Sequence, residues 1–407
     1  MNISRLAFVI ITIFILKSSS AQNKDSLSIK NGIDKSNMVS THHFGLFSAR
    51  INHNFKVRPP KKSTTQLTVQ SGNIFHPALE VFLPKDPTIR EQFSNLTWFK
   101  RPFTFIDQET TPADLINIEI DAVYKVFRLE HIIPLSENHE IGLGLRTFMP
   151  TKGTYPFSFV TSDKTIEWFH SNIAGGEDPF GRKFFGLNEV NINYEDRNGR
   201  TMQLSNNQFI FSGIEINHFY YPEYLGNKSK NLHFNFGSHL GINTSKYNPS
   251  IDVGISGNGI KKWIYNDRNE IRLGIGLSAL RKNFINFRDP VDFGNNKYIA
   301  SGEAVLEYTM YTDKKNYNTI SLFYQLQTPY NTRKEKDFFH LKGFWQEINA
   351  GWHNGYTKTL ENITTWSLMY TYGTKKIAFS VYIKQDTKVN NAPDIETGIS
   401  LKINTVK

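Results

Sequence analysis

Regular alternation of apolar and polar residues is the feature that most limits the fold of this chain. Residues 269–279 read Asn-Glu-Ile-Arg-Leu-Gly-Ile-Gly-Leu-Ser-Ala, with an aliphatic residue at every second position from Ile271 to Leu277. Successive side chains of a strand point to opposite faces, so this stretch predicts a strand with one apolar and one polar face. The pattern recurs almost to the end of the chain and predicts an all-β antiparallel fold of about 12 strands, within a range of about 10–14.

The N-terminus predicts export. Arg5 precedes an apolar run at 6–16, and small residues end at Ala21, which is the pattern of a signal peptide covering 1–21 and cleaved after Ala21. The apolar run is too short to cross a bilayer as a helix. The sequence contains no cysteine, so we expect neither disulfides nor thiolate metal sites.

The remaining residues are expected to form a single folded domain. Residues 22–40 are polar and predict a flexible mature N-terminus, and 41–407 predict one barrel domain with an inserted loop at 150–186. The first strand is expected at 43–56, paired with 64–71. Alternation fails near 345–362, where a further strand around 338–344 is an open alternative.

Two short helices are expected within the loops. One covers 86–99, where Asp86 and Pro87 form a favourable helix start. The other covers 162–174, with Ser162 as its N-cap.

Exported strands with two faces fit either an outer-membrane barrel or a secreted β-sandwich that binds a ligand. Many of the expected strands reach about 10 residues, as tilted membrane strands do, whereas soluble strands are commonly about 5–6 residues long. Aromatic residues, 14% of the chain, gather near strand ends such as 219–221 and 370–372. Short turns such as 267–269 alternate with longer connections. These features favour a barrel in the outer membrane of a Gram-negative bacterium.

A barrel turns the polar face of each strand toward its lumen. This predicts lumen-lining positions on several strands, where carboxylates face basic side chains in ion pairs and histidines take ordinary polar contacts. The predicted lumen-lining residues are Glu119, Asp121, Arg146, His233, Asn235, His239, Arg272, Glu303 and Glu307.

The inserted loop carries the strongest candidates for chemistry, although we predict no catalytic residue. Glu167 and His170 lie three apart on the expected helix and share a face, and Asp178 follows. This set would suit the alternative of an outer-membrane lipid-modifying enzyme of the acyl hydrolase type, with His170 or a lumenal histidine as base. The favoured interpretation is a loop helix that packs Trp168 and Phe169 into the barrel mouth.

A motif in the same loop resembles one in an uncharacterised family of proteobacterial outer-membrane barrel proteins. The motif comprises Phe169-His170, Gly175-Gly176, Asp178-Pro179 and Gly181-Arg182, and the resemblance covers about residues 40–200. It implies localisation and architecture only.

The predicted function is a porin-like narrow channel or transporter for small solutes or hydrophobic compounds. We expect no cofactor and no metal. The formal charge of +10 is dispersed along the chain, which argues against nucleic acid. The expected partners are outer-membrane lipid and lipopolysaccharide, the barrel-insertion machinery, and a small-molecule solute that the sequence does not identify.

Overall fold

The computed structural model describes residues 30–38, 42–88, 110–154, 157–174, 183, 186–312, 316–331, 340–342, 362–386 and 395–404. The predicted signal peptide at 1–21 and most of the predicted helix at 86–99 lie outside these ranges. No helix in the described ranges is both long enough and apolar enough to cross a membrane.

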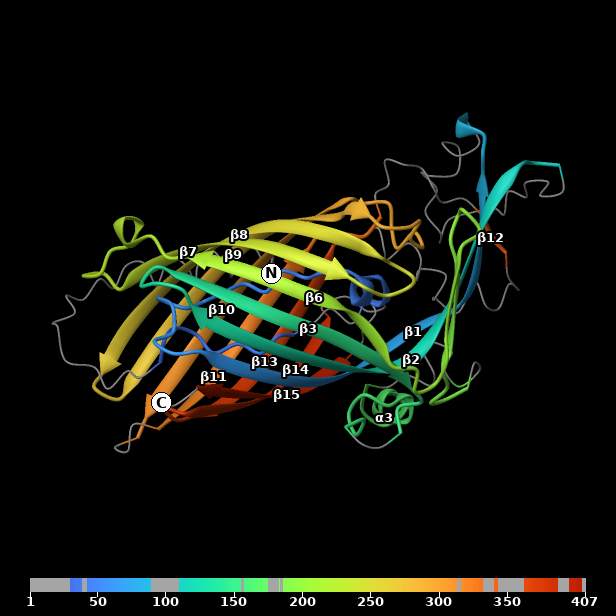
Figure 1. The fold of residues 1–407 in the computed structure, drawn as a ribbon. Helices are drawn as coiled ribbons and strands as arrows, with labels where there is room; N and C mark the ends of the chain where they lie inside the picture. Colours follow the sequence, from blue (N-terminus) through green and yellow to red (C-terminus); the bar gives the residue numbers. More distant parts are fainter. Residues whose placement is uncertain are drawn as a thin grey trace.

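Twelve strands of the described chain close into an antiparallel barrel (Figure 1). Each neighbouring pair is antiparallel, and β1 pairs with both β2 and β15, so the sheet has no free edge around the wall. In order around the wall, the strands are β1 (Thr64–Pro84), β2 (Ala113–Pro134), β3 (His139–Thr151), β6 (Ile210–Tyr220), β7 (Leu232–Asn243), β8 (Ser250–Asn266), β9 (Asn269–Asn286), β10 (Tyr298–Tyr311), β11 (Tyr317–Gln327), β13 (Ile363–Gly373), β14 (Ile377–Asp386) and β15 (Ile395–Asn404). The predicted all-β barrel is confirmed, and the sandwich alternative is wrong because the sheet closes on itself.

Three short strands extend the sheet beyond the barrel. β1 and β2 are long and project past the rim (Figure 1). On this projection β2 pairs with β4 (Asn191–Glu195), which pairs in turn with β5 (Thr201–Leu204). The strand near 338–344 is β12 (His340–Lys342), which pairs with β1 and contributes nothing to the closed wall.

The connections differ between the two ends of the barrel. Short turns at 135–138, 267–268 and 374–376 lie at one end, which we call the short-turn end. The long connections, such as 152–209 and 328–362, lie at the other, which we call the long-loop end. This asymmetry is the common arrangement in outer-membrane barrels, where the longer loops face outward from the cell.

The outer surface of the wall is apolar. Side chains that alternate with buried polar residues point outward, which is the expected result of a two-residue period on a wall with a polar interior. Exposed apolar residues on the wall include Leu67, Leu129, Leu145, Ile255, Ile275, Leu277, Leu306, Leu322, Leu368, Ile383 and Leu401. We call this surface the apolar belt. A closed barrel with such a belt satisfies all its backbone polar groups and can lie in lipid.

The expected first strand at 43–56 is wrong. Residues His43–Phe47 form a short 3-10 helix, η1, and residues 48–56 belong to no strand. Instead, residues 30–38 and 42–56 run through the interior of the barrel (Figure 1). Its side chains are buried or half-buried on both sides from 42 to 56, because the barrel wall surrounds them.

Gly398 allows an aromatic ring to lie against the inner wall. A Cβ at this position would lie 2.3 Å from Cζ of Tyr382, whose hydroxyl donates to Gln70 (3.1 Å) and Glu396 (3.3 Å). Because these bonds hold the ring in place, we expect Gly398→Ala to lower the free energy of unfolding by about 1–3 kcal/mol. Urea unfolding of the folded barrel in detergent micelles measures this. Gly302→Ala is the matched control, since its nearest new contact would be at 3.4 Å, and an equal loss there would contradict the explanation.

Candidate functional site

The candidate site is the barrel lumen together with the chain that fills it. We call residues 30–38 and 42–56 the lumen segment. It begins beside Glu307 near the short-turn end, reaches the long-loop end at η1, and returns to Glu140 near the short-turn end. The backbone amide of Ile33 donates to the carbonyl of Phe55 (2.9 Å), so the two limbs lie side by side. The wall strands therefore enclose a chain that passes along the barrel twice.

Lysines of the lumen segment bind carboxylates of the wall. Lys30 Nζ lies 2.7 Å from Glu307 Oε1, and Lys56 Nζ lies 2.7 Å from Glu140 Oε1. Lys35 forms an ion pair with Glu303, and its ammonium also lies over the ring of Phe55. All three carboxylates are buried. Charge-assisted bonds of this kind are about twice as strong as neutral ones, so they anchor both limbs to the wall.

The return limb is held through its backbone as well as its side chains. The amide of Ala49 donates to Asp252 (2.8 Å), and the amide of Arg50 donates to Glu215 (3.4 Å). Farther along, Asn235 donates to the carbonyl of Asn54 (2.8 Å). Wall side chains thus replace the neighbouring strand that an extended backbone normally requires.

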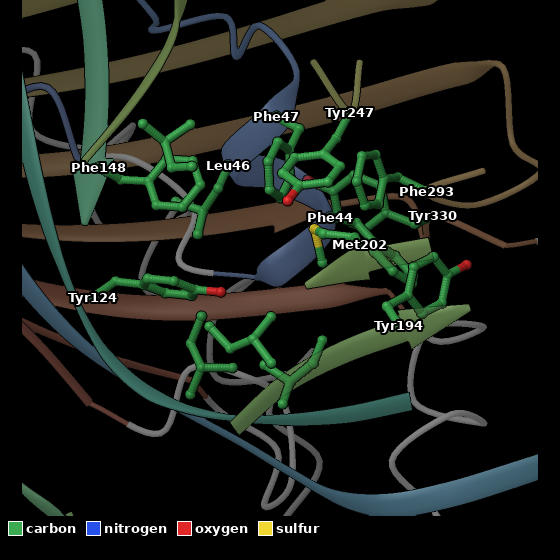
Figure 2. Packing of buried hydrophobic residues seen from close by; sticks show 14 of the residues in the cluster. Phe44, Leu46, Phe47, Tyr124, Phe148, Tyr194, Met202, Tyr247, Phe293 and Tyr330 are labelled. Carbon is green, nitrogen blue, oxygen red and sulfur yellow. The ribbon is translucent and has the colours of Figure 1, made fainter. Parts of the chain in front are cut away.

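An aromatic cluster closes the long-loop end. The ring of Phe47 in η1 stacks on Phe293 (centroids 4.6 Å apart) and meets the edge of Phe148 (5.2 Å). Tyr247 and Tyr330 complete the packing from loops at that end (Figure 2). We call this group the apex cluster. The cluster therefore joins η1 to several loops at once through aromatic packing.

Two small voids lie between the lumen segment and the wall. They measure about 20 and 70 Å³, enough only for a few water molecules. A much larger basin of about 910 Å³ opens at the short-turn end, lined by residues that include Arg58, Lys61, Glu137, Lys228 and His233. The lumen segment therefore occupies the interior of the barrel, and a basin opens at one mouth.

Several predicted lumen residues contact the lumen segment directly. Arg272 donates to the carbonyl of Gly32, and its guanidinium also lies 2.6 Å from Glu270. Arg146 donates to the carbonyl of Ser48 (2.6 Å). Glu303, Glu307 and Asn235 make the contacts given above. These residues come from strands on different sides of the wall and meet the same segment.

The other predicted lumen residues make contacts of a different kind. His239 is buried and hydrogen-bonds Asn217 (2.7 Å) and Ser256 (2.8 Å). His233 is half-buried and lines the basin. The prediction that Asp121 lines the lumen is wrong: it is buried on β2 but lies an even number of residues from exposed Leu129, so its side chain is on the outer face of the wall. Glu119 lies on the same strand, with its side chain outside the described part. In the described ranges no three His, Cys, Asp or Glu residues group in a way that would hold a metal ion.

The catalytic candidates lie in the loop between β3 and β4. The predicted helix there is confirmed as α3 (Asp163–Phe169) with a Ser162 cap, continued by the π-helical turn η3 (His170–Ala174). His170 Nδ1 is 3.7 Å from Glu167 Oε1. This distance permits an ion pair when the imidazole is protonated but is too long for a good hydrogen bond. Asp178 lies outside the described residues.

The expected packing of two aromatic residues from this helix into the barrel mouth is wrong. Trp168 is 57% exposed and Phe169 is 47% exposed. The buried residues of the helix are instead Asp163, which accepts a hydrogen bond from Asn73 on β1, together with Ile166 and Glu167, so the two rings lie on its exposed side.

The residues that sequence reasoning missed are the basic side chains of the lumen segment. The sequence pattern predicts a flexible terminus up to residue 40 and a first strand at 43–56, so it gives Lys30, Lys35 and Lys56 no role. One signal was present: in 30–58 five Lys and Arg residues stand beside a single acid, Asp34. Such a stretch, entering a lumen rich in predicted carboxylates, indicates charge complementarity.

The comparisons with known proteins yield distant structural similarities. No known protein family and no curated protein matches the sequence. Among solved structures, an outer membrane channel from Pseudomonas putida F1 aligns with 89% of this chain and 98% of its own, at 9% identity and a TM-score of 0.37. A bacterial polysaccharide outer membrane secretin aligns over 85% and 99%, at 8% identity and 0.35. The toluene transporter TodX of P. putida aligns over 86% and 91%, at 9% identity and 0.29. At TM-scores this low, these similarities carry no argument about solute or mechanism.

Proposed function

We propose that this chain is an outer-membrane channel or transporter whose narrow lumen is closed by its own lumen segment. The observation that carries the proposal is a polar chain, anchored by ion pairs, inside a closed barrel with an apolar outer surface. The apolar belt supports contact with outer-membrane lipid and lipopolysaccharide. Insertion by the barrel-insertion machinery stays a prediction, and so does the looser resemblance to a proteobacterial family.

The contacts of the lumen segment favour movement over permanent structure. Wall strands are held by continuous ladders of backbone bonds, whereas the lumen segment belongs to no strand and is held by polar contacts with the wall together with the apolar packing of η1. Water can replace the polar contacts one by one, so the segment can shift without breaking a wall strand. Low-stability elements are the ones that move in function.

The lining of the lumen supports small polar solutes more than hydrophobic compounds. Glu140, Glu303 and Glu307 bind lysine ammonium groups in the closed state. When the segment moves, these carboxylates face the passage and favour cations or solutes with a cationic group. We propose no catalytic role, since no described feature near Glu167 and His170 supplies a bound substrate position.

A reversible lock tests the proposal. Ser36 Oγ and Ser400 Oγ are 2.9 Å apart, one on the lumen segment and one on β15, and the chain has no native cysteine that could form a competing disulfide. A disulfide in S36C/S400C would tie the segment to the wall. In planar bilayers we expect brief conductance events from the wild type, silence from the oxidised variant, and recovery after dithiothreitol. S36C alone is the control. Equal conductance from the oxidised variant and the wild type would show that the segment does not close the passage.

A further inference from the structure

The loop that carries α3 and η3 lies against the outer face of the barrel. Asn73 on β1 donates to Asp163 (2.7 Å), and Ser71 hydrogen-bonds Thr161 (2.6 Å). Lys125 on β2 donates to the hydroxyl of Ser71 (2.8 Å) and to the hydroxyl of Ser158, which precedes α3 in the loop. These contacts fix residues 157–163 and the first turn of α3 to two neighbouring wall strands.

The register of these strands shows which face is covered. Leu67 on β1 pairs with Leu129 on β2, and both are exposed on the apolar belt. Ser71 is four residues from Leu67, and Lys125 is four residues from Leu129, so all four side chains point outward. The loop therefore lies on the outside of the wall. Its contact residues Ser71 and Lys125 are about 13 Å along the strands from Leu67 and Leu129, in the direction of the long-loop end. Figure 1 shows α3 outside the barrel, beside β1 and β2.

The outer side of this loop is strongly apolar. Phe159 is 89% exposed and Ile173 is 60% exposed, and Trp168 and Phe169 are exposed beside them. The inner face of α3 is already used against the protein. A group of large exposed apolar residues on one loop marks an interaction surface, and this one continues the apolar belt along the same side of the barrel.

We propose that residues 157–174 form an interfacial lipid anchor, with the apolar side chains of α3 and η3 lying in the boundary between headgroups and acyl chains at the long-loop end. Short helices that expose aromatic and aliphatic residues on one side bind this boundary, and tryptophan favours it. Lys164, exposed on α3, places an ammonium group where lipid phosphates lie. The partner is the lipid surface itself. The inference rests on the barrel spanning a membrane and is independent of what the lumen conducts.

Site-specific labelling tests the anchor, because the chain has no native cysteine. W168C and I173C, each in the full chain, are labelled with the environment-sensitive dye NBD and reconstituted into vesicles of phosphatidylcholine and phosphatidylglycerol. L277C, in the apolar belt, is the control within lipid, and D267C, in a turn at the short-turn end, is the control in water. We expect both helix dyes to emit near the wavelength of the L277C dye and to be quenched by nitroxides placed high on the acyl chain.

The outcomes separate the anchor from the barrel. If the L277C dye is in lipid while both helix dyes behave like the D267C dye, the anchor is wrong and the membrane-spanning barrel stands. If the L277C dye is also in water, the barrel does not span the vesicle membrane, and the proposed lipid anchor is then wrong as well. Heat-modifiable migration on a gel shows that each labelled variant is folded before its fluorescence is compared. Labelling two positions in the loop helix excludes an effect that one dye has on its own surroundings.

Discussion

K35A/K56A is expected to open the channel. The two lysines anchor the outgoing and returning limbs of the lumen segment to Glu303 and Glu140. A hydrogen bond to a charged group contributes about 1.5–3 kcal/mol, so losing two shifts the balance between closed and open states by about 3 kcal/mol or more. The open probability in planar bilayers should rise on the order of 10²-fold.

The open state of this variant should also select cations, because the released carboxylates face the passage. Reversal potentials in a salt gradient measure the selectivity, and adding E303Q should reduce it. The matched control is K375A/K376A, which removes the same charge from an exposed turn at the short-turn end. Equal opening of the control would trace the effect to net charge rather than to the anchors, and an unchanged open probability in K35A/K56A would count against the lumen segment as the closing element.

Glu215→Ala is expected to destabilise the barrel more than any other single wall substitution considered above. Glu215 forms an ion pair with Arg128, lies 3.0 Å from Arg146 Nε, and accepts the backbone amide of Arg50. All three charged wall side chains are about 4% exposed. Removing the carboxylate leaves two buried guanidinium groups without their shared anion, which costs about 3–5 kcal/mol. Urea unfolding in detergent micelles, followed by tryptophan fluorescence, gives the change in the free energy of unfolding.

Glu223→Ala supplies the comparison for this loss. Glu223, in the short helix η4 (Glu223–Leu225), pairs with Lys228 at 2.9 Å, and both side chains are largely exposed. Water screens such a pair, so its removal should leave the unfolding midpoint unchanged. If both variants lost the same stability, burial would not be the reason that Glu215 matters.

Much of the wall could be predicted because alternation is a local property. Arg272 is buried while Leu277, an odd number of residues away, is exposed, as a two-residue period requires. The short turns at 267–268 and 374–376 follow from the same local pattern. The cap at Ser162 could be predicted for the same reason, since an N-cap depends on the next three residues only.

The error at 43–56 has a physical reason. Odd residues from Phe47 to Phe55 are mostly apolar and the even ones polar, which correctly indicates an extended chain with two faces. The pattern does not state whether a neighbouring strand or a surrounding wall satisfies the backbone. Here Asp252 and Asn235, more than 180 residues away in sequence, provide those bonds. The exposure of Trp168 and Phe169 differs from the prediction for a similar reason, because the helical period does not identify which surface a loop helix contacts.

By itself, then, the sequence determined the architecture of the wall: the strands, their two faces and the uneven turns, all set by contacts between near neighbours in the chain. Only the tertiary structure decided that the lumen is filled, and by which residues. That outcome depends on Lys30, Lys35 and Lys56 meeting carboxylates on strands 84 to 277 residues away. Ion pairs across such separations form only after the barrel closes and the lumen excludes most water, so no local pattern could specify them.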